Sequence, residues 1–397
     1  MVHTLPEEHR SLLELVRGFA VTDVAPRADA YERAREFPRE LFDQLAAMDL
    51  TGLPFDADLG GSELPFRTYL MVIEELSRAF LALGMGLSVH TLATWGITTH
   101  ATPEQRARFV PELVAGRALG AYALSEPGSG SDAAAMTTRA RRDGDVYRID
   151  GVKAWVTHGG VADRYLVMAR TSEDGSRGIS AFVVDADQPG MTVATPESKI
   201  GLWASPTAQL RFDAAPVPAD RLLGGEEGRG FRVAMASLDG GRLGIAACAV
   251  GLAQAALDVA VDYARQREQF GRPIIDHQGV SFLLADMATR TDAARALYLS
   301  AADRRDHAAG QGPFADTPGA GSGYAVTKVA AEAKLFATDA AMQTTTDAVQ
   351  VLGGYGTTTD FPVERYLREA KILQIVEGTN QIQRLVIGRQ LTGETGR

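Results

Sequence analysis

The chain has 397 residues, of which 45% are hydrophobic and 23% charged, and its formal net charge is -10 at pH 7. A chain of this length and composition can bury a large core and is expected to form two or three domains. The acidic charge, without a Lys/Arg block or interleaved basic and aromatic residues, argues against nucleic acid as a partner.

The cysteine and histidine residues, the N-terminal segment and the apolar runs indicate the cellular compartment and whether a metal is expected. The single cysteine, Cys248, rules out an internal disulfide and lies in an apolar stretch typical of a buried helix face. The N-terminal segment lacks the basic and apolar regions of a signal peptide, and no apolar run reaches the roughly 20 residues of a membrane span. The histidines show no metal-ligand spacing. We therefore expect a cytoplasmic protein without a metal.

Hydrophobic periodicity divides the chain into three regions. From residue 6 to about 119 the period is helical, and Thr102 followed by Pro103 reads as a helix start. Between about 121 and 223, short alternating or apolar runs bounded by Asp, Gly and Pro predict a small β-domain. From residue 228 the helical period returns, which indicates a bundle. Its long helices are expected at residues 241–267, 277–307, 324–352 and 362–376.

The first chemical motif is the loop at residues 122–132, YALSEPGSGSD. Its glycines allow backbone N–H groups to approach a ligand, and its serines add hydroxyl donors suited to phosphates or a polar ring edge. A plain polar turn explains the same residues equally well. The loop is not a dinucleotide fingerprint, because the third glycine and the following helix are missing.

Trp155 and Thr157 follow one strand later. Residues two apart on a strand share a face, so an indole could cover a planar ligand while the hydroxyl bonds its edge. On its own, such a pair is more often part of a core.

Two further motifs lie in the C-terminal region. Arginines near Gly271 and Pro273, in the sequence RQREQFGRP at residues 265–273, can satisfy a helix end or reach a phosphate. The run QVLGGYG at residues 350–356 reads as a helix C-cap and turn.

Glu377 stands between an apolar run and a glycine, in IVEGTNQ at residues 375–381. Gly378 breaks the preceding helical pattern, so the carboxylate is expected to project from a chain bend, where it could act as a base. A solvated acid at a helix end is the alternative for an isolated residue of this kind.

Taken together and in this order, the motifs resemble those of the acyl-CoA dehydrogenase flavoprotein family over nearly the whole chain. The resemblance implies a mainly α fold with an N-terminal helical domain at residues 1–120, a middle β-barrel at 121–225 and a C-terminal four-helix bundle at 226–397. It also implies FAD as the cofactor and dehydrogenation of a short- to medium-chain or branched acyl-CoA to a trans-2-enoyl-CoA, as in fatty acid β-oxidation. Glu377 would be the base that removes the proton.

The family's binding roles can be carried over where residues match. Substrate contacts would come from Ser131, Asp239, Arg242 and Gly378, although Asp239 and Arg242 could equally be a local capping pair at the start of a bundle helix. FAD contacts would come from Tyr122, Leu124, Ser125, Gly130, Ser131, Trp155 and Thr157, and also from Thr379 and Gln381. The residues expected to reach the FAD of a neighbouring subunit are Arg267, Gln269, Phe270, Gln278, Gln350, Gly353 and Gly354. A homo-oligomer follows, with a dimer as the minimum and a tetramer expected.

Several alternatives stay open at this level. The family passes electrons to an electron-transfer flavoprotein, whereas the related oxidases, which use oxygen, are generally longer chains. The acyl group could instead be carried by a carrier protein, and a non-catalytic flavoprotein of the same fold is a more remote reading. Two departures from relatives bear on the substrate: Trp203 replaces a common arginine, and the segment at residues 308–323 is longer and is expected to be a surface loop.

Overall fold

The computed structural model describes residues 5–308 and 323–392, so the predicted loop at residues 308–323 lies almost wholly outside the described residues. The N-terminal part is helical. Its elements are α1 (Glu7–Phe19), a π-helical segment (Ala20–Val24), α2 (Ala25–Ala34), α3 (Arg39–Ala47), α4 (Phe66–Ala79), α5 (Leu81–His100) and α6 (Pro103–Val114). The predicted start of α6 is confirmed: the Thr102 hydroxyl accepts from the Gln105 backbone N–H, and the Gln105 side chain accepts from the Thr102 N–H.

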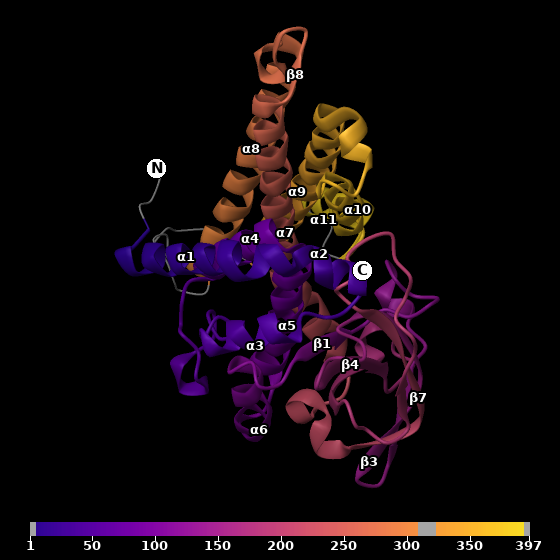
Figure 1. Cartoon of the computed structure of the whole chain (residues 1–397). Coiled ribbons are helices and arrows are strands. Elements are labelled where there is room, and N and C mark those ends of the chain that lie inside the picture. Colours follow the sequence, from indigo (N-terminus) through magenta and orange to yellow (C-terminus); the bar gives the residue numbers. More distant parts are fainter. Residues whose placement is uncertain (1–4, 309–322, 393–397) are drawn as a thin grey trace.

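A curled, seven-stranded sheet follows (Figure 1). Its strands are β1 (Gly120–Ala123), β2 (Arg139–Asp143), β3 (Val146–Thr157), β4 (Arg164–Arg170), β5 (Ile179–Asp185), β6 (Met191–Val193) and β7 (Thr207–Pro218). They are ordered β1-β4-β2-β3-β7-β6, with β5 paired to β4. The hairpin between β2 and β3 turns at Gly144, whose φ of +63° favours glycine. The predicted β-domain is thus a half-open barrel.

The C-terminal part is a helical bundle: α7 (Gly230–Gln266), α8 (Gln278–Ala308), α9 (Gly323–Leu352), α10 (Val363–Leu373) and α11 (Asn380–Thr392). A short hairpin, β8 (Glu268–Gln269) and β9 (Arg272–Pro273), joins α7 to α8 at one end of the bundle (Figure 1). The prediction that α7 begins near residue 241 is wrong, because the helix starts at Gly230 and has 37 residues. The helix predicted at 362–376 ends at Leu373.

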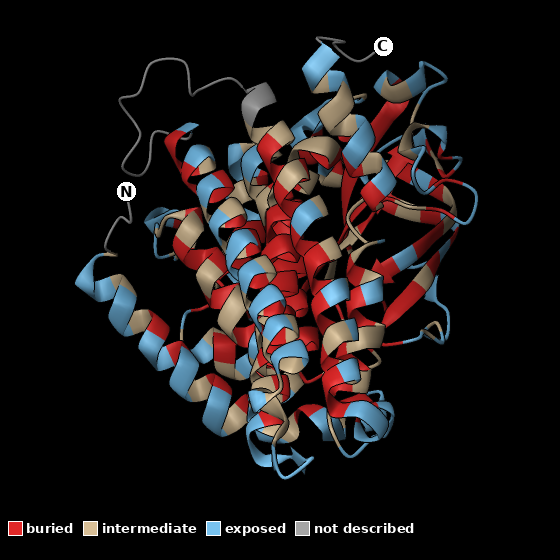
Figure 2. Ribbon diagram, turned by 90° about the horizontal axis from the view of Figure 1, so that it is seen from above, coloured by how far each residue is buried: buried red, intermediate tan, exposed pale blue. Residues whose placement is uncertain are grey.

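The core lies where α7 meets both halves of the molecule. This helix packs against α4, α5, α8 and α9, and buried residues concentrate along the central helices (Figure 2). Cys248 lies at this centre and is fully buried and unpaired, as predicted. Within the described residues α7 is the one helix long and apolar enough to span a membrane, but 72% of its most apolar window is buried inside the protein. That burial is typical of a central bundle helix.

Candidate active site

Glu377 lies in the bend between α10 and α11, as predicted, and adopts the left-handed conformation with φ of +54°. Such a conformation costs of order 1–3 kcal/mol for a residue other than glycine and persists only where neighbours enforce it. The Gln383 side chain donates to the Gly378 carbonyl at 2.8 Å, and the Lys334 ammonium donates to the same carbonyl at 3.0 Å. Lys334 also donates to the Asn380 side chain at 2.8 Å. Buried polar side chains of α9 and α11 therefore hold the bend in place.

The carboxylate of Glu377 points into the protein. Its Oε2 atom is buried and has no hydrogen-bond partner among the described residues, and it lies 2.9 Å from where a Cβ on Gly241 would stand. Burial raises the pKa of Glu377 to about 7, against the opposing charges of Arg242 and Lys334. The backbone N–H of Glu377 donates no hydrogen bond within the described chain. A base with a pKa near neutrality thus stands beside a free N–H donor.

Tyr122, at the end of β1, approaches this carboxylate. Burial, followed by the charge of Glu377, raises the pKa of the Tyr122 phenol well above its ordinary value, so the phenol is neutral and a donor. Its hydroxyl donates to the Ala234 carbonyl at 3.2 Å. The end of the first strand, the N-terminal part of α7 and the bend before α11 therefore meet, although they lie far apart in sequence.

A buried ion pair holds the predicted ligand loop against β3. The Lys153 ammonium donates to Glu126 at 2.8 Å and to the Leu124 carbonyl at 2.9 Å, and both charged side chains are almost fully buried. Glu126 also accepts from the backbone N–H groups of Thr137 and Thr138. The Ser125 carbonyl accepts from Ala154 on β3 at 2.8 Å. The loop is thereby fixed next to Trp155 and Thr157.

Trp155 lies in an irregular part of β3 rather than on a regular strand. It has φ of +60°, and the register with β7 shifts between Lys153 and Val156, as in a β-bulge. The indole is 60% exposed although it is large and apolar. Because of this bulge, the regular alternation of a strand does not by itself place Trp155 and Thr157 on one face.

Asp239 and Arg242 lie well inside α7, so the expectation that they stand at the start of a helix is wrong, and the capping interpretation fails with it. Arg242 donates to Asp239 at 2.7 Å, and the Thr327 hydroxyl donates to the same carboxylate at 2.6 Å. Arg242 is almost fully buried, and its Nε atom has no partner among the described residues.

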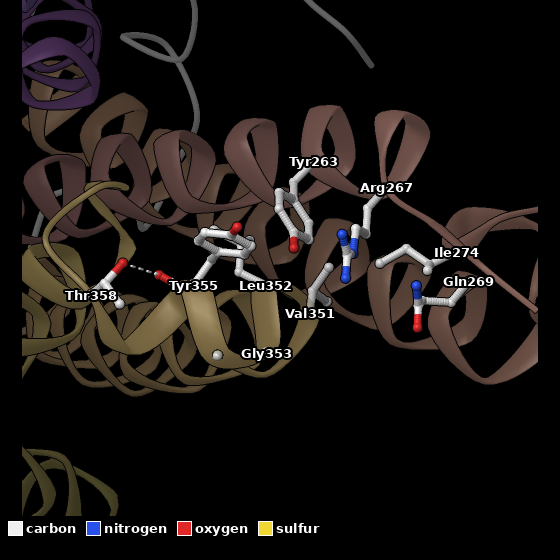
Figure 3. Close-up of a pocket in the computed structure, with 10 residues that line it drawn as sticks. Tyr263, Arg267, Gln269, Ile274, Val351, Leu352, Gly353, Tyr355 and Thr358 are labelled. Atoms are coloured by element: carbon white, nitrogen blue, oxygen red, sulfur yellow. Dashed lines mark hydrogen bonds between the residues drawn. The ribbon is translucent and has the colours of Figure 1, made fainter.

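The second predicted set gathers at the far end of the bundle. Arg267 and Gln269 reach from the end of α7 and from β8 toward Val351 and Gly353 at the end of α9 (Figure 3). Gly354 lines the same groove, whose empty volume is about 820 Å³ with the adjoining solvent included. Gln278 and Gln350 are exposed nearby in the chain, and Phe270, at the hairpin tip, is 95% exposed. The predicted C-cap is also present, since Gly353 follows α9 with φ of +58°.

The other predicted positions flank the Glu377 bend or the loop. Thr379 precedes α11 and accepts from the Ile382 N–H at 3.3 Å, whereas Gln381 is exposed. Gly130 and Ser131 are exposed, and a Cβ on Gly130 would meet no atom within 4 Å. Trp203 lies between Arg35 of the N-terminal part and Arg368 of α10, and its backbone N–H donates to Glu32 at 2.9 Å.

Sequence reasoning missed three charged residues that hold the site together. Lys334, Lys153 and Glu126 are buried. Lys334 bonds the backbone of Gly378 and Lys153 bonds the backbone of Leu124, both of them predicted site residues, while Glu126 accepts from Lys153. The available signal was a lysine inside an otherwise apolar run, such as residues 152–156 around Lys153. A buried lysine is rare unless a partner accepts its charge.

The helical, β and helical arrangement defines a three-domain dehydrogenase fold. Models of three domains match the chain in order: acyl-CoA dehydrogenase N-terminal domain at residues 6–117, middle domain at 121–215 and C-terminal domain at 228–392. An acyl-CoA dehydrogenase of Bacillus subtilis is 46% identical over 98% of this chain and 99% of its own.

Solved structures agree. Butyryl-CoA dehydrogenase from Megasphaera elsdenii matches with a TM-score of 0.92 at 39% identity, covering 99% of this chain and 100% of that one. A chain in the structure of the electron transferring flavoprotein of Acidaminococcus fermentans matches with a TM-score of 0.92 at 40% identity, covering 98% and 99%.

The chain belongs to the acyl-CoA dehydrogenase family. The predicted family, fold class, enzyme activity and FAD cofactor are confirmed: the protein is an FAD-dependent oxidoreductase that dehydrogenates acyl-CoA thioesters. Its similarity to members of this family over nearly the full chain indicates a soluble protein.

Proposed function

We propose that Glu377 is the base that removes the proton next to the thioester carbonyl. The observation that carries this proposal is the buried, unpaired Oε2 atom with a pKa of about 7 beside a free backbone N–H of the same residue. The N–H can donate to the thioester carbonyl, which stabilises the charge that develops when the proton leaves. FAD supplies the acceptor for the hydride from the neighbouring carbon. The product is a trans-2-enoyl thioester.

The residues of the loop at 122–132 and of β3 fit a flavin. The exposed Trp155 indole offers a flat face, and Thr157 lies two residues further along β3. In the loop, added Cβ atoms on Gly128 and Gly130 would meet nothing within 4 Å, so open space lies in front of this backbone. Tyr122, Leu124, Ser125, Ser131, Thr379 and Gln381 complete the proposed FAD set. Arg242, Asp239, Ser131 and Gly378 form the proposed substrate set.

The predicted FAD-binding residues at the end of the bundle are proposed to act on a different FAD molecule. Glu377 contacts α7 at Gly241, and Arg267 follows this helix at its other end. Over that interval a helix rises about 39 Å at about 1.5 Å per residue. This separation from the catalytic carboxylate supports the binding of a second FAD molecule at the end of the bundle. We therefore propose that Arg267, Gln269, Phe270, Gln278, Gln350, Gly353 and Gly354 bind the FAD of a neighbouring subunit in a homotetramer, with a dimer as the minimum.

Replacing Arg267 with Ala is expected to weaken FAD binding by about 10–100-fold, because a hydrogen bond to a charged group contributes about 1.5–3 kcal/mol. The measurement is the affinity of the apoprotein for FAD, followed by flavin fluorescence. Arg265→Ala is the matched control, since Arg265 is exposed at the same helix end and pairs with Asp262 at 3.8 Å. An equal loss of affinity in both variants would contradict the proposal.

The proposed physiological role is that of a cytoplasmic enzyme of β-oxidation type. Its proposed substrate is a short- to medium-chain or branched acyl-CoA, and its proposed electron acceptor is an electron-transfer flavoprotein. Two comparisons support it: one solved relative is a butyryl-CoA dehydrogenase, and another chain comes from an electron transferring flavoprotein structure. The same names favour coenzyme A over a carrier protein, and the unpaired Glu377 favours catalysis over a binding role.

Anaerobic mixing of the holoenzyme with acyl-CoA thioesters is expected to bleach the flavin. Only the carboxylate form of Glu377 accepts a proton. Below its pKa of about 7 the bleaching rate should therefore rise about tenfold per pH unit, and above it the rate should level off. Stopped-flow absorbance between pH 5 and 9 measures this profile. Bleaching by carrier-bound thioesters alone would instead support the carrier-protein alternative.

A further inference from the structure

Two buried histidines meet at the backbone of Gly120, where β1 begins: His90 of α5, and His158, which directly follows β3. The His158 Nδ1 atom lies 2.9 Å from the Gly120 carbonyl oxygen, and the Gly120 N–H donates to His90 Nδ1 at 3.0 Å. The other nitrogen of His90, Nε2, lies 2.9 Å from the Leu113 carbonyl oxygen. The two imidazole rings therefore join an N-terminal helix to both strands that carry proposed FAD-binding residues.

Both imidazole rings are neutral, so each has one donor and one acceptor nitrogen. Burial lowers the pKa of His90 to about 3 and that of His158 to about 4. Because a carbonyl oxygen only accepts, His158 carries its proton on Nδ1 and donates to Gly120. His90 carries its proton on Nε2, donates to Leu113 and accepts from Gly120 through Nδ1. The contacts with the backbone thereby select one tautomer of each ring.

The backbone of His158 is also fixed. Its φ of +66° lies in the left-handed region, which residues other than glycine seldom adopt. Its N–H donates to the Pro206 carbonyl at 2.9 Å, which extends the pairing of Thr157 with Thr207 between β3 and β7. The side chain and the backbone of His158 therefore both anchor the residue that directly follows Thr157.

The imidazole of His158 fits closely between N-terminal helices. It packs edge-on to Phe37, with ring centroids 5.2 Å apart, and its Nε2 atom lies 3.3 Å from where a Cβ on Gly86 of α5 would stand. Glycine at this position therefore leaves the room that the ring needs. The Nε2 atom is buried and has no hydrogen-bond partner within residues 5–308 and 323–392. The ring is thus held by its bond to Gly120 and by packing.

Thr157 is the neighbour whose position depends on this ring. Its side chain is partly exposed, and its hydroxyl group forms no hydrogen bond among the residues that the structure describes. The next residue, His158, is buried and bonded through both its ring and its backbone. The Thr157 hydroxyl is therefore free for a ligand, while the backbone that carries it is held in place.

We propose that His158 is a positioning residue that holds Thr157 at the edge of the flavin, with His90 holding Gly120 from the other side. This inference rests on the proposed function, because it takes Thr157 as an FAD contact. The role requires a side-chain donor to the Gly120 carbonyl on a residue that tolerates a left-handed backbone. Asparagine meets both requirements, since its amide donates and it adopts this conformation more readily than most residues.

Variants of His158 test the proposal in the FAD-loaded protein. His158→Ala is expected to shift the visible absorbance bands of the bound flavin and to weaken FAD binding by the apoprotein about 2–10-fold, the loss expected for one neutral hydrogen bond. His158→Asn should restore both properties. Gly86→Ala, which displaces the unchanged ring at its Nε2 edge, should also shift the bands. Gly18→Ala is the helix control, because a Cβ there would meet no atom within 4 Å.

Thr157→Val separates this inference from the proposed function. If it leaves the bands and the FAD affinity unchanged, Thr157 does not contact the flavin, and the proposed contact and the inference both fall. If Thr157→Val alters them but His158→Ala does not, only the inference is overturned. A His158→Asn variant as impaired as His158→Ala would also overturn it.

A double variant shows whether the ring acts through the hydroxyl. Added to Thr157→Val, His158→Ala should cause little further loss of FAD affinity, because the two residues form one unit. Losses that simply add would contradict the positioning role. If His158→Ala does not fold, Gly86→Ala decides: flavin bands identical to those of Gly18→Ala would overturn the proposal.

Discussion

Replacement of Glu377 by Gln is expected to leave the fold and FAD content intact while slowing flavin reduction by roughly 10⁴-fold, the upper end of general-base effects. The amide keeps the size of the side chain but cannot take a proton. No second base takes over, because the pKa of the neighbouring Tyr122 phenol is raised well above its ordinary value. Anaerobic stopped-flow absorbance with an acyl-CoA that bleaches the wild type gives the rate.

A matched variant separates loss of the base from loss of a buried charge. Glu369 on α10 is also buried, and burial raises its pKa to about 8, but it lies near Arg365 and Glu32 rather than at the bend. Glu369→Gln is expected to reduce the flavin at a rate within a few-fold of wild type. Unchanged bleaching in Glu377→Gln would exclude Glu377 as the base.

The second large effect is expected on stability. Lys153→Met leaves Glu126 charged and buried without its cation, and breaking a buried pair in this way costs about 3–5 kcal/mol. Although burial raises the pKa of Glu126, Lys153 and the donors from Thr137 and Thr138 lower it overall to about 2. The resulting stabilisation is present above pH 4.5, the ordinary pKa of this carboxyl, and is lost as the pH falls toward 2. Urea unfolding followed by fluorescence measures both effects.

An exposed pair in the same domain supplies the control. Arg148 and Asp143 lie 2.7 Å apart on the surface of the β2–β3 hairpin, so Arg148→Met should cost no more than about 1 kcal/mol. The double variant Lys153→Met with Glu126→Gln should recover part of the loss, because no uncompensated charge remains. If Lys153→Met were as mild as Arg148→Met, the ion pair would not hold the ligand loop.

The two predictions concern different parts of one site. Glu377 acts on the substrate, whereas Lys153 acts through Glu126 on a loop that faces Trp155 and Thr157. A variant of Lys153 that still folds is therefore expected to bind FAD more weakly, while Glu377 keeps its position.

Local features of the sequence predicted the elements well. Thr102 and Pro103 marked the start of α6, Gly353 marked the end of α9, and Gly378 marked the bend that carries Glu377. These positions depend on backbone conformations and caps that a few adjacent residues determine. The start of α7 was missed because glycines at 240 and 241 resemble a helix boundary. Their actual cause is the close approach of Arg305 and Glu377, which leaves no room for a Cβ.

The sequence by itself determined the order of helical and β regions, the family and the candidate base, because periodicity and motifs are written in neighbouring residues. Only the tertiary structure decided the state of that base: the pKa of Glu377 depends on burial against Gly241 and on the charges of Arg242 and Lys334, which come from other helices. Electrostatic interactions and packing act through space. Residues distant in the chain therefore determine the pKa and the burial of a residue that a local motif only identifies.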